Sequence, residues 1–395
     1  MNENRGGPNK THLLLVSGQL RYAVKFRGSL IREFVRQGLR VTVASPVDDD
    51  STGELAVELA EMGAELLPTK LSRTGLNPVH DTADIIELSR WIRSHKPDKV
   101  FALAAKPILV GISAAILGGV SGRYAMLAGL GYAFVDSGEG SLKKRLVRSG
   151  QLLAYRMLLR RCRAVIFHNS DDKVLLVRRG VVREDQTRVV AGSGVDLARF
   201  RPSVPPVEPV RFLFLGRLLK SKGIMELLEA MRRIRNRYPA VELHLAGATD
   251  PNPEAVDPAV LQQYIDEGLV VHHGHVENVV PLLEQTSVYV LPSYREGLPL
   301  SVLEALSSGR TAIVTDVPGC RDVVQPGVYG ALVPVRDSQA LAAAMVAYIE
   351  EPTRIVKEGI AARVAAEERF DVKQVNRAML TALEITPVGA LRDDP

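Results

Sequence analysis

Two glutamates, Glu296 and Glu304, stand eight residues apart on either side of a turn and a helix start. An apolar run ends at Leu291, and Pro299 then suits the first turn of a helix, where its missing N–H costs nothing. The free amides near residues 298–301 would form an anion site of the kind that binds phosphate. A carboxylate on either side suits a polar ligand rich in hydroxyl groups, such as a sugar or a ribose. The spacing alone also fits a solvated glutamate and a glutamate in the first turn of an ordinary helix.

Two cations follow another apolar run, Phe212–Leu215, in a motif that continues with Gly216. Arg217 and Lys222 would stand after the first strand of a sheet, where they could neutralise a departing diphosphate without a metal ion. The alternative is a pair of solvated surface cations.

Glycines mark two further turns. Gly18 follows the apolar run at residues 12–16, and its missing side chain would let the backbone approach a ligand. Gly192 and Gly194 allow a tight turn shortly before a Pro-rich break at residues 201–209. A plain connecting turn is the alternative at both places.

Histidines and cysteines suggest no metal site. His272, His273 and His275 stand close together, but no cysteine or carboxylate joins them at ligand spacing. Cys162 and Cys320 are far apart in the chain, so we expect reduced thiols.

Short apolar runs alternate with longer helical patterns along the chain, which predicts an α/β fold with parallel sheets covered on both faces. The alternation of apolar runs and helical patterns begins again after the Pro-rich break, so we expect two doubly wound, Rossmann-like domains facing a central cleft. These span residues 11–202 and 209–370, and a segment at 371–390 crosses back to the first. The expected strands are His12–Val16, Arg40–Ala44, Ala64–Leu67, Lys99–Leu103, Arg123–Leu127, Ala164–His168, Arg188–Ala191, Arg211–Leu215, Glu242–Ala246, Val270–His272, Val288–Leu291, Ala312–Thr315 and Ala331–Pro334. The expected helices include Leu30–Gln37, Glu54–Met62, Val79–His95, Leu109–Leu117, Ile224–Tyr238 and Leu300–Ser307.

Composition narrows the class of protein. The chain has 395 residues, 46% of them apolar and 24% charged, which excludes wholesale disorder and a disulfide-stapled miniprotein. Neither GxGxxG nor GxxxxGK[ST] is present, which weighs against a dehydrogenase or a P-loop ATPase. The polar N-terminus lacks the apolar core of a signal peptide.

The charge is distributed unevenly. The net charge is +5, but residues 1–200 hold 30 basic and 20 acidic residues, and the rest of the chain is net −5. Residues 142–163 alone hold eight cations and no acid, with Leu142, Leu146, Leu153 and Met157 at helical spacing. A basic amphipathic helix can dock on anionic lipid, at ~1 kcal/mol per near-surface cation. The alternative is the solvated face of a helix packed on the sheet, and we expect no nucleic acid as a partner.

Taken together, these residues resemble the retaining glycosyltransferases of family 4, which have the GT-B fold. The resemblance covers residues 12–385 and rests on Glu296 and Glu304, on Gly216–Gly223 and on Ser193–Phe200. Three shorter segments, at residues 71–78, 129–134 and 250–253, resemble a bacterial branch that builds surface glycans. Some members of that branch extend a sugar on a polyprenyl-diphosphate carrier.

The resemblance implies a role for each matching residue. Arg217 and Lys222 would bind the donor diphosphate, Glu296 would contact the donor sugar and Glu304 would hold the ribose hydroxyls. The turn at Gly274–Val276 would hold the nucleobase edge. The full set of further substrate-binding candidates is Gly18, Lys106, Asn169, Gly274, Val276, Gly297, Leu298, Pro299 and Leu300.

One stretch departs from the family pattern. Many relatives carry a histidine near the donor sugar, where this chain reads Ala104-Ala105-Lys106-Pro107. Lys106 is therefore a candidate for a phosphate or acceptor contact, with an ordinary loop lysine as the alternative. An enzyme of this kind is thought to need no protein base, so the missing histidine does not exclude catalysis.

The implied activity is the retaining transfer of a hexose from a nucleotide-sugar, expected to be UDP-linked, to a lipid-linked or growing bacterial surface glycan. No cofactor and no metal are expected. A nucleotide-sugar 2-epimerase on the same fold and a non-catalytic nucleotide-sugar-binding subunit are the alternatives. A polyprenyl-linked acceptor would require residues 142–163 to meet an anionic membrane surface. We therefore expect a cytoplasmic protein, peripheral on the inner face of the cell membrane.

Overall fold

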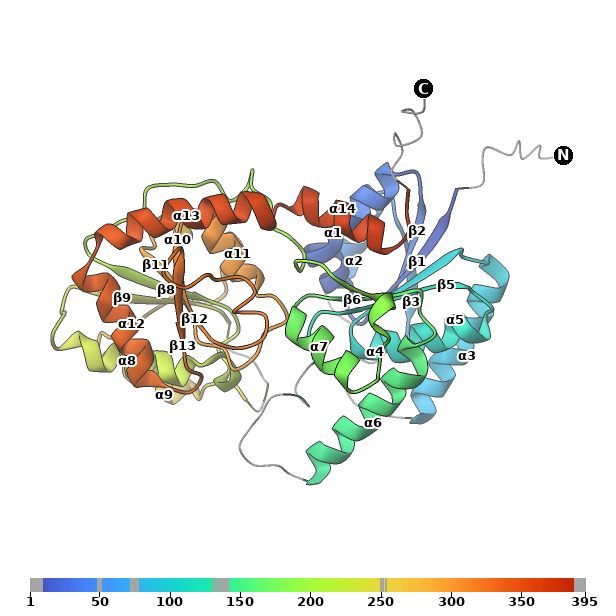
Figure 1. Cartoon of the computed structure of the whole chain (residues 1–395), viewed down its shortest axis with the longest axis horizontal. Helices are drawn as coiled ribbons and strands as arrows, with labels where there is room; N and C mark the ends of the chain where they lie inside the picture. The colour runs from blue at the N-terminus through green and yellow to red at the C-terminus, as the bar shows by residue number, and fades with distance from the viewer. Residues whose placement is uncertain are drawn as a thin grey trace. The chain divides into compact units, whose positions relative to one another are not determined.

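The computed structural model describes residues 10–47, 52–71, 78–130, 134, 142–248, 252 and 254–386. The chain forms two compact units, each built around its own parallel sheet (Figure 1). The first unit comprises Met1–His168, Asp172–Ser193 and Asn376–Pro395, and the second comprises Asn169–Asp171 and Gly194–Val375. The segments expected to mark a surface-glycan branch lie largely outside the described residues.

Within the described residues, the sheet of the first unit has seven strands in the order β3-β2-β1-β4-β5-β6-β7. Leu13 pairs with Val41 on one side and with Lys99 on the other, and both pairings are parallel. The inner strands β1, β4, β5 and β6 are almost wholly buried because helices cover both faces of the sheet, whereas the edge strands β3 and β7 are largely half-buried or exposed. They are β1 His12–Ser17, β2 Arg40–Pro46, β3 Glu65–Thr69, β4 Lys99–Leu103, β5 Gly122–Leu127, β6 Ala164–Phe167 and β7 Thr187–Val189.

The helices of the first unit pack in two layers, with α1 against α2 and α3 against α5 (Figure 1). Helix α1 begins at Leu20, ten residues before the segment expected from the sequence, because Ala23 and Val24 continue its buried face. Gly28 lies inside this helix, where a Cβ would come within 2.9 Å of the Met62 side chain. Helices α7 and α14 contribute residues to both units. The helices are α1 Leu20–Arg36, α2 Thr52–Glu61, α3 Pro78–His95, α4 Ala105–Pro107, the π-helical segment Ile108–Ile112, α5 Ser113–Leu117, α6 Leu142–Leu159, α7 Ser170–Arg178 and α14 Val372–Ala382.

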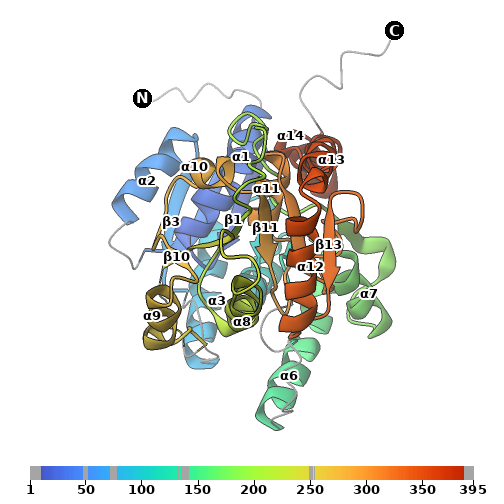
Figure 2. The ribbon, with the colours of Figure 1, turned by 90° about the vertical axis from the view of Figure 1, so that its left-hand side faces the viewer.

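The sheet of the second unit has six strands within the described residues, in the order β10-β9-β8-β11-β12-β13. The strands are β8 Arg211–Leu215, β9 Glu242–Ala246, β10 Val271–His272, β11 Val288–Leu291, β12 Thr311–Thr315 and β13 Gly330–Val333. Helices α8 and α12 lie side by side in front of this sheet in Figure 2, and α11 packs against α13. The helices are α8 Ile224–Arg235, α9 Pro258–Asp266, α10 Val280–Glu284, α11 Leu300–Ser307, α12 Ser338–Glu350 and α13 Thr353–Arg369.

The strands expected from the sequence are all present, each within two residues at either end. Cys162 and Cys320 are both free and buried, one in each unit. Among the helices of the described part, none is both long and apolar enough to cross a membrane.

Candidate active site

Two segments follow neighbouring strands of the second unit. Residues 216–223 hold Arg217 and Lys222, and residues 292–299, here called the glutamate loop, hold Glu296. Strands β8 and β11 pair in parallel, with Phe212 opposite Val288. The loops at their carboxyl ends therefore meet at one edge of the sheet. Lys222, just before α8, places Nζ 2.5 Å from Oε1 of Glu296, and these side chains are only 25% and 12% exposed. This partial burial limits solvent screening of the ion pair.

A glycine allows the two loops to approach closely. Gly223 has a φ of +73°, and a Cβ there would lie 2.0 Å from the carbonyl oxygen of Pro292. Next to it, the N–H of Tyr294 donates to the carbonyl of Ser221 at 2.9 Å. Only glycine fits this position, so the local sequence fixes the approach of Lys222 to the glutamate loop.

The backbone of Glu296 and Gly297 is held from the other side. Gly319 has a φ of +82°, and a Cβ there would lie 2.6 Å from the Gly297 carbonyl oxygen and 2.7 Å from that of Glu296. The N–H of Glu296 donates to the Pro318 carbonyl at 3.3 Å. Asn169, which belongs to the second unit, donates its side-chain N–H to the Gly297 carbonyl at 2.8 Å. These contacts fix where the Glu296 carboxylate can point.

Sequence reasoning missed several of these supporting residues. The Tyr294 hydroxyl donates to Oε1 of Glu226 at 2.6 Å, and the Arg336 guanidinium lies 4.6 Å from the Tyr294 ring centre. The Thr315 hydroxyl donates to the Ser293 carbonyl. A Pro-Gly pair marks the turn at Gly319 and could have been noticed. The Tyr294–Glu226 contact joins distant segments and leaves no local signal.

Helix α11 begins immediately after the glutamate loop. Its cap residue, Pro299, has an extended backbone, and no side chain of the described residues caps the helix. The N–H of Val302 donates to the Pro299 carbonyl at 3.1 Å, and a helix start without a side-chain cap can accept an anion such as a phosphate. The buried Tyr289 hydroxyl lies 2.7 Å from Oγ of Ser301 in this turn. Gly297, Leu298 and Leu300 are half-buried around it.

Glu304 lies in the middle of α11 and is half-buried. Burial raises the pKa of its carboxyl to about 7, and the positive charge of Arg199 offsets part of that rise. Near neutral pH the group therefore exists in both protonation states. A ligand hydroxyl that donates a hydrogen bond would favour the ionised form.

The remaining candidates of the second unit stand at the same edge of the sheet. Arg217 is exposed in the turn that follows β8. A Cβ on Gly247 would lie 1.8 Å from the Gly216 carbonyl oxygen, and the Gly247 N–H donates to the Gly274 carbonyl at 2.8 Å. The turns after β8, β9 and β10 are thus in contact, and Val276 is half-buried beyond them.

The candidates of the first unit also lie together. A Cβ on Gly18 would be 3.6 Å from the Pro107 side chain. Lys106 forms an ion pair with Asp81, and the two side chains are only 11% and 8% exposed. Ala104 has φ 74° and ψ 175°, a conformation that is normally restricted to glycine. Such strain accumulates at functional sites. The Asp81 partner was not foreseen from the sequence.

The histidines are held by protein contacts. His168 is buried, and its Nε2 lies 2.9 Å from the Arg27 guanidinium. Burial and the Arg27 charge keep the pKa of His168 well below its usual value, so the ring is neutral. His244 Nδ1 lies 2.9 Å from His273 Nε2. The described residues contain no group of three or more His, Cys, Asp or Glu that could hold a metal ion.

Comparison with known proteins extends over both units. A family described as glycosyl transferase 4-like matches residues 13–169, and one described as glycosyl transferases group 1 matches residues 209–351. The chain is 27% identical over 312 residues to the N,N'-diacetylbacillosaminyl-diphospho-undecaprenol α-1,3-N-acetylgalactosaminyltransferase of Campylobacter jejuni, covering 76% of this chain and 79% of that protein. It is 26% identical to the UDP-Gal:α-D-GlcNAc-diphosphoundecaprenol α-1,3-galactosyltransferase of Escherichia coli, over 68% of this chain and 70% of that one.

Solved structures agree on the fold. The sucrose-phosphate synthase of Thermosynechococcus elongatus superposes with a TM-score of 0.80 at 20% identity, covering 95% of this chain and 98% of its own. Anabaena Alr3699/HepE in complex with UDP gives a TM-score of 0.74 at 20% identity, covering 95% and 99%. The α/β fold expected from the sequence is therefore confirmed, and the chain is an enzyme that belongs to the family 4-like glycosyltransferases with the GT-B fold.

Proposed function

We propose that this enzyme transfers a hexose from a UDP-sugar, with retention of configuration, to a glycan carried on a polyprenyl diphosphate. Two of its relatives are named for acceptors linked to diphospho-undecaprenol, and one of these is also named for UDP-galactose. A structural neighbour was solved with UDP. These names support both the donor and the acceptor class.

The observation that carries the proposal is the 2.5 Å ion pair between Lys222 and Glu296 beside the start of α11. Lys222, Arg217 and the first-turn amides of α11 supply positive charge for a diphosphate. The Glu296 carboxylate can accept hydrogen bonds from sugar hydroxyls, and Glu304 can accept them from the ribose. Gly18, Lys106 and Asn169 are the remaining residues that we propose to bind substrate.

The chemistry needs no protein base. The bond between the anomeric carbon and the diphosphate oxygen breaks, and the electron pair leaves with the UDP. The acceptor hydroxyl attacks the same face of the sugar and passes its proton to the departing diphosphate oxygen. Lys222 and Arg217 stabilise the charge that develops on that oxygen, which is the step where a fixed cation lowers the barrier most.

Helix α6 supplies the proposed contact with the membrane. Leu146, Leu153 and Met157 are 65%, 60% and 52% exposed, and they recur along one side of the helix. Arg156 and Arg160 are exposed beside them. An exposed apolar stripe flanked by arginines fits an anionic lipid surface, where the polyprenyl carrier resides.

The test is a transfer assay with the full chain. UDP-glucose, UDP-galactose and their N-acetylamino forms are each incubated with undecaprenyl-diphosphate-linked N-acetylglucosamine, and GDP-mannose serves as the contrasting donor. We expect acceptor-dependent UDP release and an axial product linkage in the NMR spectrum. Inversion of configuration, transfer from GDP-mannose alone, or a free 2-epimer formed without acceptor would each overturn the proposal.

A further inference from the structure

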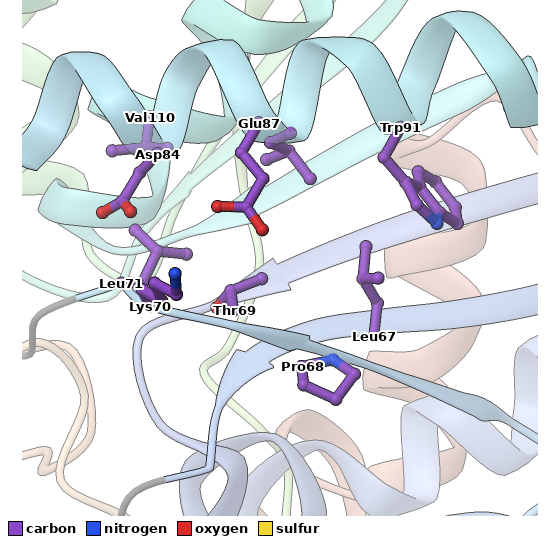
Figure 3. A pocket seen from close by; sticks show the side chains of 10 residues that line it. Leu67, Pro68, Thr69, Lys70, Leu71, Asp84, Glu87, Trp91 and Val110 are labelled. Atoms are coloured by element: carbon purple, nitrogen blue, oxygen red, sulfur yellow. The ribbon is translucent and has the colours of Figure 1, made fainter.

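The first unit contains a pocket to which none of the roles above was assigned. It lies between strand β3 and helix α3, as Figure 3 shows from close by, and its empty volume is about 420 Å³. Part of this volume is solvent at the mouth of the pocket, so a ligand bound there would be enclosed only in part.

One wall of the pocket is a single face of α3. Asp84, Glu87 and Trp91 recur three and four residues apart, so their side chains share that face and project toward β3 (Figure 3). Among the residues that the structure describes, neither carboxylate has a hydrogen-bond or ion-pair partner. Asp84 is half-buried and Glu87 is exposed. Burial and the charge of Asp81 raise the pKa of the Asp84 carboxyl, and the charge of Lys106 offsets part of that rise.

The opposite wall combines polar and apolar groups. Lys70 and Thr69 stand at the end of β3, and Leu67 and Leu71 line the space beside them. The Thr69 hydroxyl oxygen is buried without a hydrogen-bond partner among the described residues. The pocket therefore offers two carboxylate acceptors, an ammonium donor and an apolar surface.

The aromatic part of the pocket is held in place. The Trp91 ring stacks on His95 with 4.2 Å between ring centres and an interplanar angle of 9°. It also meets the edge of the His12 ring at 5.9 Å. A ring fixed in this way loses little conformational entropy when a ligand packs against it.

We propose that this pocket binds one pyranose residue of the acceptor glycan, with its hydroxyls on Asp84 and Glu87 and its C–H face against Trp91. A sugar is the ligand whose apolar face and ring of hydroxyl donors match these walls together. A lipid tail would leave two carboxylates desolvated and unpaired. A phosphate would be repelled by two carboxylates and attracted by only one ammonium group. That the sugar comes from the acceptor rests on the proposed function.

Trp91 is the single tryptophan of the chain, so its fluorescence reports on this pocket directly. The full chain is titrated with galactose, N-acetylglucosamine, N-acetylgalactosamine, lactose and chitobiose. At least one sugar should change the Trp91 emission saturably. The Glu87→Gln protein should bind that sugar about tenfold more weakly, which corresponds to the free energy of one hydrogen bond to a charged group. The control Glu61→Gln removes an exposed carboxylate of the same unit and should leave the affinity unchanged. An unresponsive emission with every sugar, or equal affinities in the two variants, would overturn the proposal.

A kinetic measurement tests the acceptor assignment. In the transfer assay, Glu87→Gln should raise KM for an acceptor of two or more sugars about tenfold, with kcat and the donor KM retained. An unchanged acceptor KM in this variant would show that the pocket does not take the acceptor. If the fluorescence responds to sugar but the wild type transfers nothing, the proposed function fails and the saccharide site stands.

Discussion

Lys222 and Glu296 are 74 residues apart in the sequence, yet they form an ion pair at the carboxyl ends of two adjacent strands. Each side chain neutralises the other before any ligand arrives. A diphosphate that binds at the start of α11 must share the Lys222 ammonium with Glu296. The pair therefore links the charge of the donor diphosphate to the orientation of the carboxylate proposed to hold the donor sugar.

Replacement of Glu296 tests this link. Glu296→Gln keeps the size of the side chain but removes the charge that positions Lys222. We expect kcat for transfer to fall about 100-fold or more, the range for removal of a preorganised electrostatic contact. Because the Glu296 side chain is only 12% exposed, loss of its charge should also lower the unfolding temperature, so kcat is compared at a temperature where both proteins are folded. Glu368→Gln, at an exposed position of α13, is the matched control and should retain full activity. Near-normal transfer by Glu296→Gln would contradict the site assignment.

Gly319 and Gly327 form a matched pair for testing the backbone of the glutamate loop. Both have a positive φ, +82° and +76°, but only a Cβ on Gly319 would meet another backbone, that of Glu296 and Gly297. Gly327→Ala should cost about 1 kcal/mol in the free energy of unfolding, the usual cost of a left-handed residue. Gly319→Ala should cost about 2 kcal/mol or more and should also reduce transfer activity. Equal effects of the two substitutions on activity would show that the close approach at Gly319 does not position Glu296.

The fold could be predicted from the sequence because the patterns that specify its strands and helices lie within short stretches of the chain. Apolar runs such as Val288–Leu291 occupy central strands, and their lengths match the strands almost residue for residue. Pro299 and the apolar residues after it likewise specify the start of α11. The extension of α1 back to Leu20 was less visible, because Gly28 and several charged residues interrupt its apolar pattern.

The contacts that complete the site could not be predicted in the same way. Asp81 pairs with Lys106 across 25 residues, and the Tyr294–Glu226 contact spans 68 residues. Such pairs depend on how helices and strands pack, and no spacing in the chain encodes them. Motifs could therefore nominate Lys106, but only the fold shows that a buried carboxylate holds it.

Glu304 should make stability depend on pH. Burial raises the pKa of its carboxyl from an ordinary value of 4.5 to about 7, so between these values the folded state binds more protons than the unfolded state. The free energy of unfolding should therefore fall as pH rises from about 4.5 to about 7, by at most ~3 kcal/mol. Glu304→Gln should remove this part of the pH dependence in denaturant titrations. An identical pH profile in the variant would show that Glu304 does not titrate in this range.

The same carboxyl should couple pH to nucleotide binding. Ribose hydroxyls donate hydrogen bonds more strongly to the ionised form, so UDP affinity should rise as pH increases through about 7. Calorimetric titration with UDP at pH 6 and pH 8 measures the effect. In Glu304→Gln the affinity should be lower, and it should keep only the pH dependence that comes from the terminal phosphate of UDP, which itself titrates near pH ~6. A wild-type affinity that is flat between the two pH values would contradict the ribose role.

The apolar stripe on α6 provides the test of membrane docking. Leu146 and Leu153 are 65% and 60% exposed, so changing both to serine leaves the core intact and removes the surface proposed to enter the lipid. Binding of Leu146→Ser/Leu153→Ser to vesicles of phosphatidylglycerol should weaken about tenfold or more, because each buried CH₂ contributes about 0.8 kcal/mol. Ile360 and Val364 on α13 are 65% and 46% exposed, and the double serine variant at these positions is the control. Binding should also weaken with added salt, since Arg156 in α6 and Arg160 just after it are exposed and contribute by charge. Equal loss in both double variants, or vesicle binding that neither salt nor the α6 change affects, would exclude α6 as the docking surface.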